Sequence, residues 1–119
     1  MVACWAKILH RVPEARLILK YCGFDDRETS RQYLHLFADH QVAPARIELR
    51  GWSPYAQMLA EYHEIDLALD PFPFCGAATS CEALWMGVPV VTCPQETFAS
   101  RQTLAILSSI GLTETVASP

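Results

Sequence analysis

Apolar residues recur along the chain with two periods, which predicts helices and short strands in alternation. Trp5, Ile8, Leu9 and Val12 follow a helical spacing before Pro13, so we expect the chain to begin inside a helix. Short runs dense in apolar residues and bounded by Gly, Pro or Asp are typical of buried strands. Four such runs are expected as strands, over residues 15–21, 46–51, 65–70 and 88–93.

Helices are expected to fill the gaps between these strands. Asp25, with Glu28 three residues later, resembles the start of a helix with a capping box. Ser53 and Pro54 have the residue types of an N-cap and first turn. Gly87 is expected to end a helix as its C-terminal cap. The last two helices are predicted over residues 79–86 and 98–110, the latter stopping at Gly111.

The order of elements predicts a single α/β domain over residues 1–119. Short strands that alternate with helices form a Rossmann-like parallel sheet with helices on both faces. Such a domain ordinarily opens with a strand, whereas this sequence opens with a helix. We therefore expect a first strand to be missing from the N-terminal side. The sheet edge left open would favour self-association.

Composition narrows the class of protein. The net charge is −4 without a basic run, which argues against nucleic acid as a partner. No stretch approaches the roughly 20 apolar residues of a membrane span, and the first residues lack the pattern of a signal peptide. Five scattered cysteines predict buried reduced thiols in a cytoplasmic protein. Trp5 and Trp85 are expected in the core, while Trp52 fits either a core or a ligand role.

The segment DLALDPFPFCGAATSCEALW, residues 66–85, carries the strongest chemical signal. Ligands of open parallel sheets bind beyond the carboxyl ends of the strands. Small residues there let a ligand approach the first amides of the next helix, near Ala78, Thr79 and Ser80, which form an anion site. The hydroxyls of Thr79 and Ser80 add donors, and Glu82 can accept bonds from a ribose. The pattern indicates a nucleoside diphosphate site.

A purely structural interpretation stays open for the same residues. The small residues form an ordinary tight loop in that case, and Glu82 only complements the helix dipole. The sequence has no P-loop, no GxGxxG, no HExxH and no Asp-x-Asp motif. We therefore expect neither a cofactor nor a metal ion.

The sequence resembles a known family over essentially its whole length. The segments WAKILHRVPEARLIL and RIELRGWSPYAQMLAEYHEIDLALDPFPFCGAATSCEALWMGVPVVTCPQETFASR look like the C-terminal catalytic lobe of the O-GlcNAc transferase family, glycosyltransferase family 41, in its bacterial form. CEALWMGVPVVT followed by ETFASR is its most specific signature. The resemblance implies a GT-B fold, metal-independent transfer of GlcNAc from UDP-GlcNAc to serine or threonine hydroxyls, and tetratricopeptide repeats upstream that present protein acceptors.

The resemblance also implies roles for individual residues. The loop that grips the diphosphate falls on Ala77, Ala78 and Thr79, and the ribose-binding acid falls on Glu82. The backbone near two further residues, Trp52 and Ser53, would meet the uracil.

Several positions depart from the family pattern. Ala77 and Ala78 stand where relatives often have His or Thr, Cys75 replaces a common Asn, and Tyr55 and Met58 replace basic or imidazole groups. The lysine that neutralises the leaving diphosphate lies upstream of residue 1.

Three functions are weighed on these grounds. The first is the UDP-GlcNAc-binding part of a protein O-GlcNAc transferase, inactive alone. The alternative is a non-catalytic interaction or scaffold domain that keeps the fold without nucleotide affinity. A phosphate-binding regulatory domain of flavodoxin-like shape is the third, although the sequence lacks the acidic cluster that such domains need.

Overall fold

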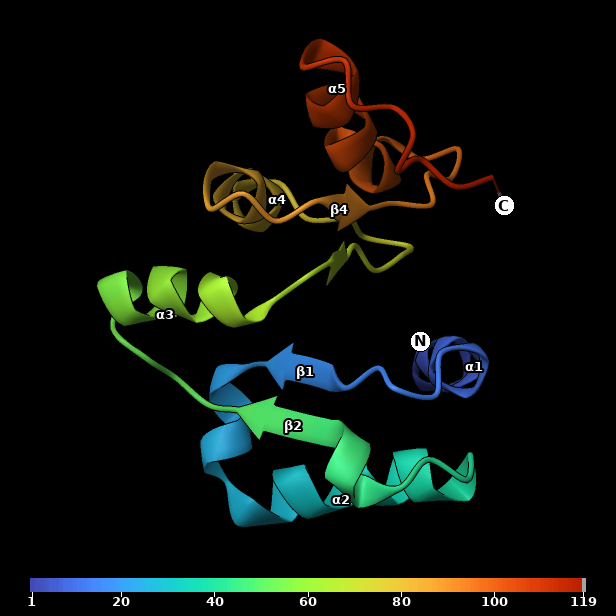
Figure 1. Cartoon of the computed structure of the whole chain (residues 1–119), viewed down its shortest axis with the longest axis vertical. Coiled ribbons are helices and arrows are strands. Elements are labelled where there is room, and N and C mark those ends of the chain that lie inside the picture. The colour runs from blue at the N-terminus through green and yellow to red at the C-terminus, as the bar shows by residue number, and fades with distance from the viewer. Residues whose placement is uncertain (119) are drawn as a thin grey trace. The chain divides into compact units, whose positions relative to one another are not determined.

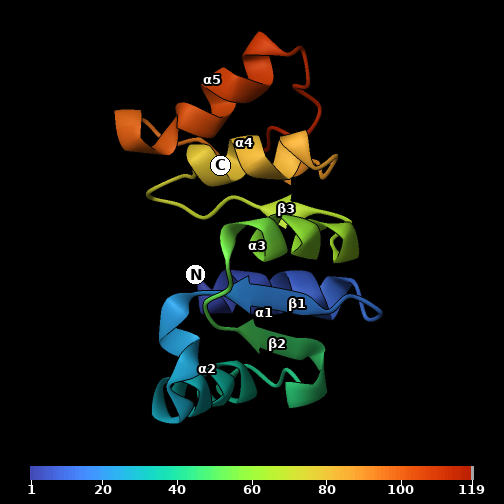
Figure 2. The same ribbon diagram turned by 90° about the vertical axis from the view of Figure 1, so that its left-hand side faces the viewer.

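The computed structural model describes residues 1–118, which form two compact α/β units. The first unit covers Met1–Ser53 and the second begins at Pro54. Each unit contains one pair of parallel strands packed with helices (Figures 1 and 2). The predicted alternation of helices and parallel strands is therefore confirmed within each unit.

The first unit opens with the expected helix. Helix α1 (Val2–Arg11) is followed by strand β1 (Leu17–Lys20), the long helix α2 (Arg27–Asp39) and strand β2 (Ile47–Arg50). Short 3-10 turns η1 (Cys22–Asp25) and η2 (Pro44–Arg46) precede α2 and β2. The strands pair in parallel with Leu17 opposite Ile47 and Lys20 opposite Arg50.

The core of the first unit forms where the two helices meet the strands. Phe37 on α2 is completely buried, and its ring stacks on that of Trp5 on α1, with centroids 6.5 Å apart. The other buried members of the cluster are Ala6, Leu9, Val42 and Ile47. Arg46, directly before β2, binds the end of α1 and the segment after it. Its guanidinium donates to the carbonyl groups of Leu9, Val12 and Ala15. The bond to Leu9 satisfies a carbonyl in the last turn of α1, and the bonds to Val12 and Ala15 hold the segment that follows the helix.

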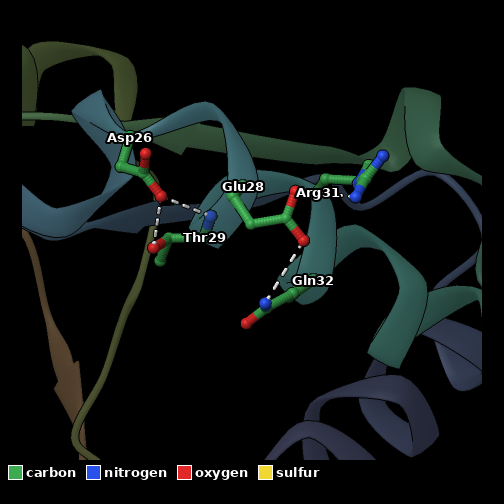
Figure 3. Close-up of polar contacts among 5 residues, drawn as sticks. All are labelled: Asp26, Glu28, Thr29, Arg31 and Gln32. Atoms are coloured by element: carbon green, nitrogen blue, oxygen red, sulfur yellow. Dashed lines mark hydrogen bonds and ion pairs between the residues drawn. The ribbon is translucent and has the colours of Figure 1, made fainter.

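The start of α2 differs from the expected capping box. The N-cap is Asp26, not Asp25: its Oδ2 accepts from the backbone N–H of Thr29 at 2.7 Å and from the Thr29 hydroxyl at 2.8 Å (Figure 3). Glu28 contacts Arg31 at 2.7 Å and Gln32 at 3.3 Å within the helix. Asp25 instead accepts the backbone N–H of Trp52 at 3.1 Å, a long-range contact that a local pattern does not encode.

The second unit has shorter strands than the sequence predicts. Its elements are α3 (Tyr55–Glu61), η3 (Tyr62–Glu64), β3 (Ala68–Leu69), α4 (Ala78–Trp85), β4 (Val90–Val91), η4 (Phe98–Ser100) and α5 (Gln102–Ser109). Strands β3 and β4 pair in parallel, and Thr92 forms a further parallel bridge with Val116. The helix expected over residues 98–110 is thus divided into η4 and α5. Pro54 occupies the N-cap of α3, so the predicted side-chain cap by Ser53 is wrong.

Two glycines end helices as predicted. Gly87 has φ +83°, its N–H donates to the carbonyl of Leu84, and the N–H of Val88 donates to that of Ala83. Gly111 has φ +72° and ends α5 in the same way. Its N–H donates to the carbonyl of Ser108, and the N–H of Leu112 donates to that of Leu107. Both ends are Schellman motifs, in which glycine avoids the steric cost of a positive φ.

The second core lies between α4 and its strand pair. Ala83, Val88 and Val90 are buried, with Leu84 packed against them. Trp85, expected in the core, is 87% exposed, so that prediction is wrong. It follows Leu84 by one residue and therefore lies about 100° further around the helix. Of the five cysteines, only Cys75 is buried, and all are free thiols.

Phe37→Ala is expected to destabilise the protein by about 3–5 kcal/mol, because it empties a completely buried site. Trp85→Ala is expected to change stability by less than about 0.5 kcal/mol, as surface substitutions usually do. Urea denaturation of both variants tests the pair. Equal destabilisation would show that Trp85 is packed.

The Asp26 cap predicts a pH dependence. Hydrogen bonds from the Thr29 backbone and hydroxyl lower the pKa of Asp26 below its ordinary 3.8. A lowered folded-state pKa means that the cap stabilises fully above pH 3.8 and loses its effect as pH falls through the folded-state pKa. Asp26→Ala should therefore lower the Tm at pH 7, and the difference from the parent chain should shrink toward pH 3. A difference that is independent of pH would contradict the charge-dependent cap.

Candidate functional site

The loop between β3 and α4 is held by Asp70, which directly follows β3. Its Oδ1 accepts the backbone N–H of Gly76 at 2.6 Å, and its Oδ2 accepts the hydroxyl of Thr92 at 2.7 Å. Thr92 directly follows β4 and is buried. One carboxylate thus links the carboxyl ends of both strands to the entry of α4.

A second tether joins the same loop to η4. The backbone N–H and the thiol of Cys75 both donate to the carbonyl of Ala99, each at 3.0 Å. The Cys75 sulfur also accepts the backbone N–H of Gln102 at 3.2 Å. The Cys75 side chain is buried, so the residue serves as a hydrogen-bonding part of the loop.

A buried hydroxyl pair forms the third tether. Thr103 donates to the carbonyl of Gly76 at 2.9 Å, and its oxygen lies 2.9 Å from that of Ser80. Because a hydroxyl has one proton, Ser80 must be the donor to Thr103. Ser80 is only 4% exposed. The expectation that its hydroxyl is a free donor for phosphate is therefore wrong, and Thr79 keeps that role alone.

Gly76 occupies a place that no side chain fits. A Cβ there would lie 2.7 Å from the hydroxyl oxygens of both Thr79 and Ser80 and 3.3 Å from Asp70 Oδ1. Both backbone polar groups of Gly76 are also bonded, to Asp70 and Thr103. The small residues of this loop therefore serve first to bring the backbone close to the strand-end side chains.

The start of α4 is exposed and has no side-chain cap. Ala77 is the N-cap, and the first backbone bond of the helix runs from Cys81 N–H to the Ala77 carbonyl. Within residues 1–118, no group accepts from the amides of Ala78 and Thr79. Ala77, Ala78 and Thr79 are all exposed. The helix dipole and the two amides make this end suited to an anion.

Glu82 lies one turn further along α4 and faces two tyrosines of the same unit. The hydrogen bond from the Tyr55 hydroxyl to the Glu82 carboxylate raises the pKa of Tyr55, and the negative charge of Glu82 adds to the effect. Burial raises the pKa of Tyr62, and the charge of Glu82 contributes to the rise. The Tyr62 hydroxyl also lies 3.4 Å from the carbonyl of Thr79. Both tyrosines are therefore neutral donors at physiological pH.

A pocket of about 350 Å³ lies beside this helix start. Asp70, Thr79 and Ser80 supply its polar groups, and the rest of its wall is mainly apolar. Its lining residues are Tyr62, Ala68, Leu69, Asp70, Pro71, Phe74, Cys75, Gly76, Thr79, Ser80, Ala83 and Val90.

The structure brings together four of the six residues predicted for the site. Ala77, Ala78, Thr79 and Glu82 lie within the first turns of α4 or at its cap. Trp52, 71% exposed, and Ser53 end the first unit, and their approach to the others stays a prediction.

Three contributors were missed by sequence reasoning. Asp70, Thr92 and Thr103 hold the loop through contacts that span 6 to 27 residues. The only available signal was that Asp70 and Thr92 lie at the carboxyl-terminal ends of the strands predicted over residues 65–70 and 88–93.

Residues 1–118 lack two further kinds of feature. No helix among them is long and apolar enough to cross a membrane. Residues 1–118 contain no group of three or more His, Cys, Asp or Glu side chains arranged to hold a metal ion.

The arrangement is closely similar to that of a solved glycosyltransferase. The fold matches the structure of a point mutant of the Thermobaculum terrenum O-GlcNAc transferase with a TM-score of 0.95 and 44% identity, over 98% of this chain and 22% of that one. The chain is therefore a Rossmann-like α/β portion of a GT-B catalytic lobe.

Sequence relatives define the family more closely. The profile of glycosyl transferase family 41 matches residues 1–119. The rice protein described as a probable UDP-N-acetylglucosamine–peptide N-acetylglucosaminyltransferase SPINDLY is 34% identical over 117 residues. The Caenorhabditis elegans UDP-N-acetylglucosamine–peptide N-acetylglucosaminyltransferase is 32% identical over 114 residues. The chain belongs to glycosyltransferase family 41. It spans 12% and 10% of those two relatives.

Thr103→Val is expected to destabilise the second unit by about 1–3 kcal/mol, because the Gly76 carbonyl and the Ser80 hydroxyl lose their buried partner. Thr79→Val changes an exposed hydroxyl at the same helix start and serves as the matched control. Thermal and urea unfolding compare the two. Equal effects from both variants would show that the Thr103 hydroxyl does not hold the loop.

Proposed function

We propose that the chain is the UDP-GlcNAc-binding part of a protein O-GlcNAc transferase. The observation that carries the proposal is the exposed start of α4, where two amides without acceptors and the Thr79 hydroxyl lie one turn from Glu82. The separation of one helical turn between these donors and Glu82 suits a diphosphate next to a ribose. Membership of glycosyltransferase family 41 supports the same assignment.

Each group has a defined task in this proposal. The amides of Ala78 and Thr79 and the Thr79 hydroxyl donate to the phosphates, and the helix dipole favours their charge. Glu82 accepts from the ribose hydroxyls. Its carboxylate already accepts from Tyr55, but two carboxylate oxygens offer about four acceptor positions. The backbone at Trp52 and Ser53 meets the uracil.

The proposed reaction needs more groups than these. A serine or threonine oxygen of the acceptor forms a bond to the anomeric carbon of GlcNAc and loses its hydroxyl proton to a base or to water. The bond from that carbon to the UDP oxygen breaks, and UDP leaves with the electron pair. The negative charge that develops on UDP must be stabilised for the reaction to proceed. Here the α4 amides and Thr79 supply that stabilisation without a metal ion. We propose that the leaving-group lysine, the acceptor surface and tetratricopeptide repeats belong to other parts of a cytoplasmic enzyme.

A scaffold function is the second candidate, and specific residues favour it. Ala77 and Ala78 provide no side-chain donors, although both are exposed at the helix start. Tyr55 occupies part of the Glu82 carboxylate. A domain that kept the fold and lost nucleotide affinity would retain the buried tethers of Thr103 and Cys75 all the same.

UDP is expected to bind weakly and without magnesium. Each charge-assisted hydrogen bond contributes about 1.5–3 kcal/mol, so the loss of two moves a micromolar site toward the millimolar range. Thr79→Ala and Glu82→Gln should each weaken binding further, by about tenfold, with little change in Tm. Calorimetry and NMR titration measure the affinities, with Trp85→Ala as the exposed control on α4. If millimolar UDP shifts no NMR resonance of α4, the result would favour the scaffold function over nucleotide binding.

The isolated chain is expected to transfer no sugar, because the acceptor surface and the leaving-group lysine are assigned elsewhere. Incubation with radiolabelled UDP-GlcNAc and a serine- and threonine-rich peptide tests this. Incorporation of label above a no-protein control would refute the expectation.

A further inference from the structure

The two oxygens of the Asp70 carboxylate bind separate parts of the candidate site. Oδ1 holds the Gly76 amide and Oδ2 holds the Thr92 hydroxyl. We propose that Asp70 is a positioning residue for the nucleotide: it fixes Gly76 so that the first amides of α4 stay presented to the phosphates. The inference rests on the proposed UDP site and adds a residue that acts on it indirectly.

The loop that Asp70 spans has little other support. Between Asp70 and Cys75, residues 71–74 make no backbone hydrogen bond to any part of residues 1–118, and two of them are prolines without an N–H. All four are exposed. The loop therefore depends on its ends. Cys75 is bonded to Ala99 and Gln102, and Asp70 and Thr103 bind the two polar groups of the adjacent Gly76. Gly76 precedes the α4 N-cap, so its position sets where the exposed amides begin.

The charge of Asp70 opposes the role of the site. Asp70 lines the same pocket as Thr79 and Gly76, where a carboxylate repels a diphosphate. The hydrogen bonds of Asp70 explain why a carboxylate lies here. A charged acceptor binds the Gly76 amide and the Thr92 hydroxyl more strongly than a neutral acceptor would. Geometry and charge are therefore separable by substitution. Asp70→Asn keeps an oxygen for the Gly76 amide and removes the charge, whereas Asp70→Ala removes both.

The experiment compares UDP affinity and Gly76 amide exchange in the full 119-residue chain. Asp70→Ala should weaken UDP binding about tenfold or more and speed exchange of the Gly76 amide, since the amide loses a charge-assisted bond. Asp70→Asn should keep the Gly76 amide protected and bind UDP at least as well as the parent chain. Asp66→Ala removes an exposed aspartate four residues earlier and is the matched control, with parental affinity expected.

Two results would overturn the positioning role. One is parental UDP affinity in folded Asp70→Ala, measured well below its Tm. The other is an equal loss of affinity in Asp70→Asn and Asp70→Ala while Gly76 stays protected, which would assign the effect to charge. Failure of the proposed function has a different signature: the parent chain would bind neither UDP nor inorganic pyrophosphate, and the positioning role would fall with it.

Discussion

The backbone of Gly76 is the point on which the second unit depends. Its N–H is bound by the strand-end carboxylate of Asp70, and its carbonyl is bound by Thr103 on α5. A buried peptide group that lacked these partners would cost free energy comparable to a lost hydrogen bond. Satisfying both groups fixes the loop to the strand ends and to α5 at once. Together with the bonds of Cys75 and Ser80, these two bonds fix where the following helix starts.

This constraint explains why the site has exposed amides. A side-chain cap at the start of α4 would satisfy them, and Ala77 provides none. The buried hydroxyls of Ser80 and Thr103 hold the loop, whereas the Thr79 side chain is exposed. Stability is thus supplied from beneath the helix, while its outer end remains available to an anion. In the proposed function, the loop must be held in place and the first amides of α4 must stay free for the phosphates. Different residues near the start of α4 meet these two requirements.

Local patterns predicted the elements well and the long-range contacts poorly. The spacing of Trp5, Leu9 and neighbouring residues gave α1, and Gly87 and Gly111 gave the helix ends, because those signals act within a few residues. Trp85 was misplaced because size and apolarity do not specify which side of a short helix faces the strands. The role of Ser80 was missed because its partner is 23 residues away, on a helix whose approach no local signal encodes. The cap moved from Asp25 to Asp26 for a related reason: Asp25 is engaged by Trp52.

The hydrogen-bonded thiol of Cys75 has a consequence for chemical labelling. Cys22 and Cys81 are exposed and open to thiol reagents, whereas Cys75 is buried between Ala99 and Gln102. A reagent reaches the Cys75 sulfur only when the loop separates from η4, which also frees the backbone bond from Cys75 to Ala99. In a chain whose other cysteines are replaced, the rate of Cys75 alkylation therefore reports how often this loop opens. The Cys75 thiol can therefore be used to measure local unfolding at the edge of the candidate site.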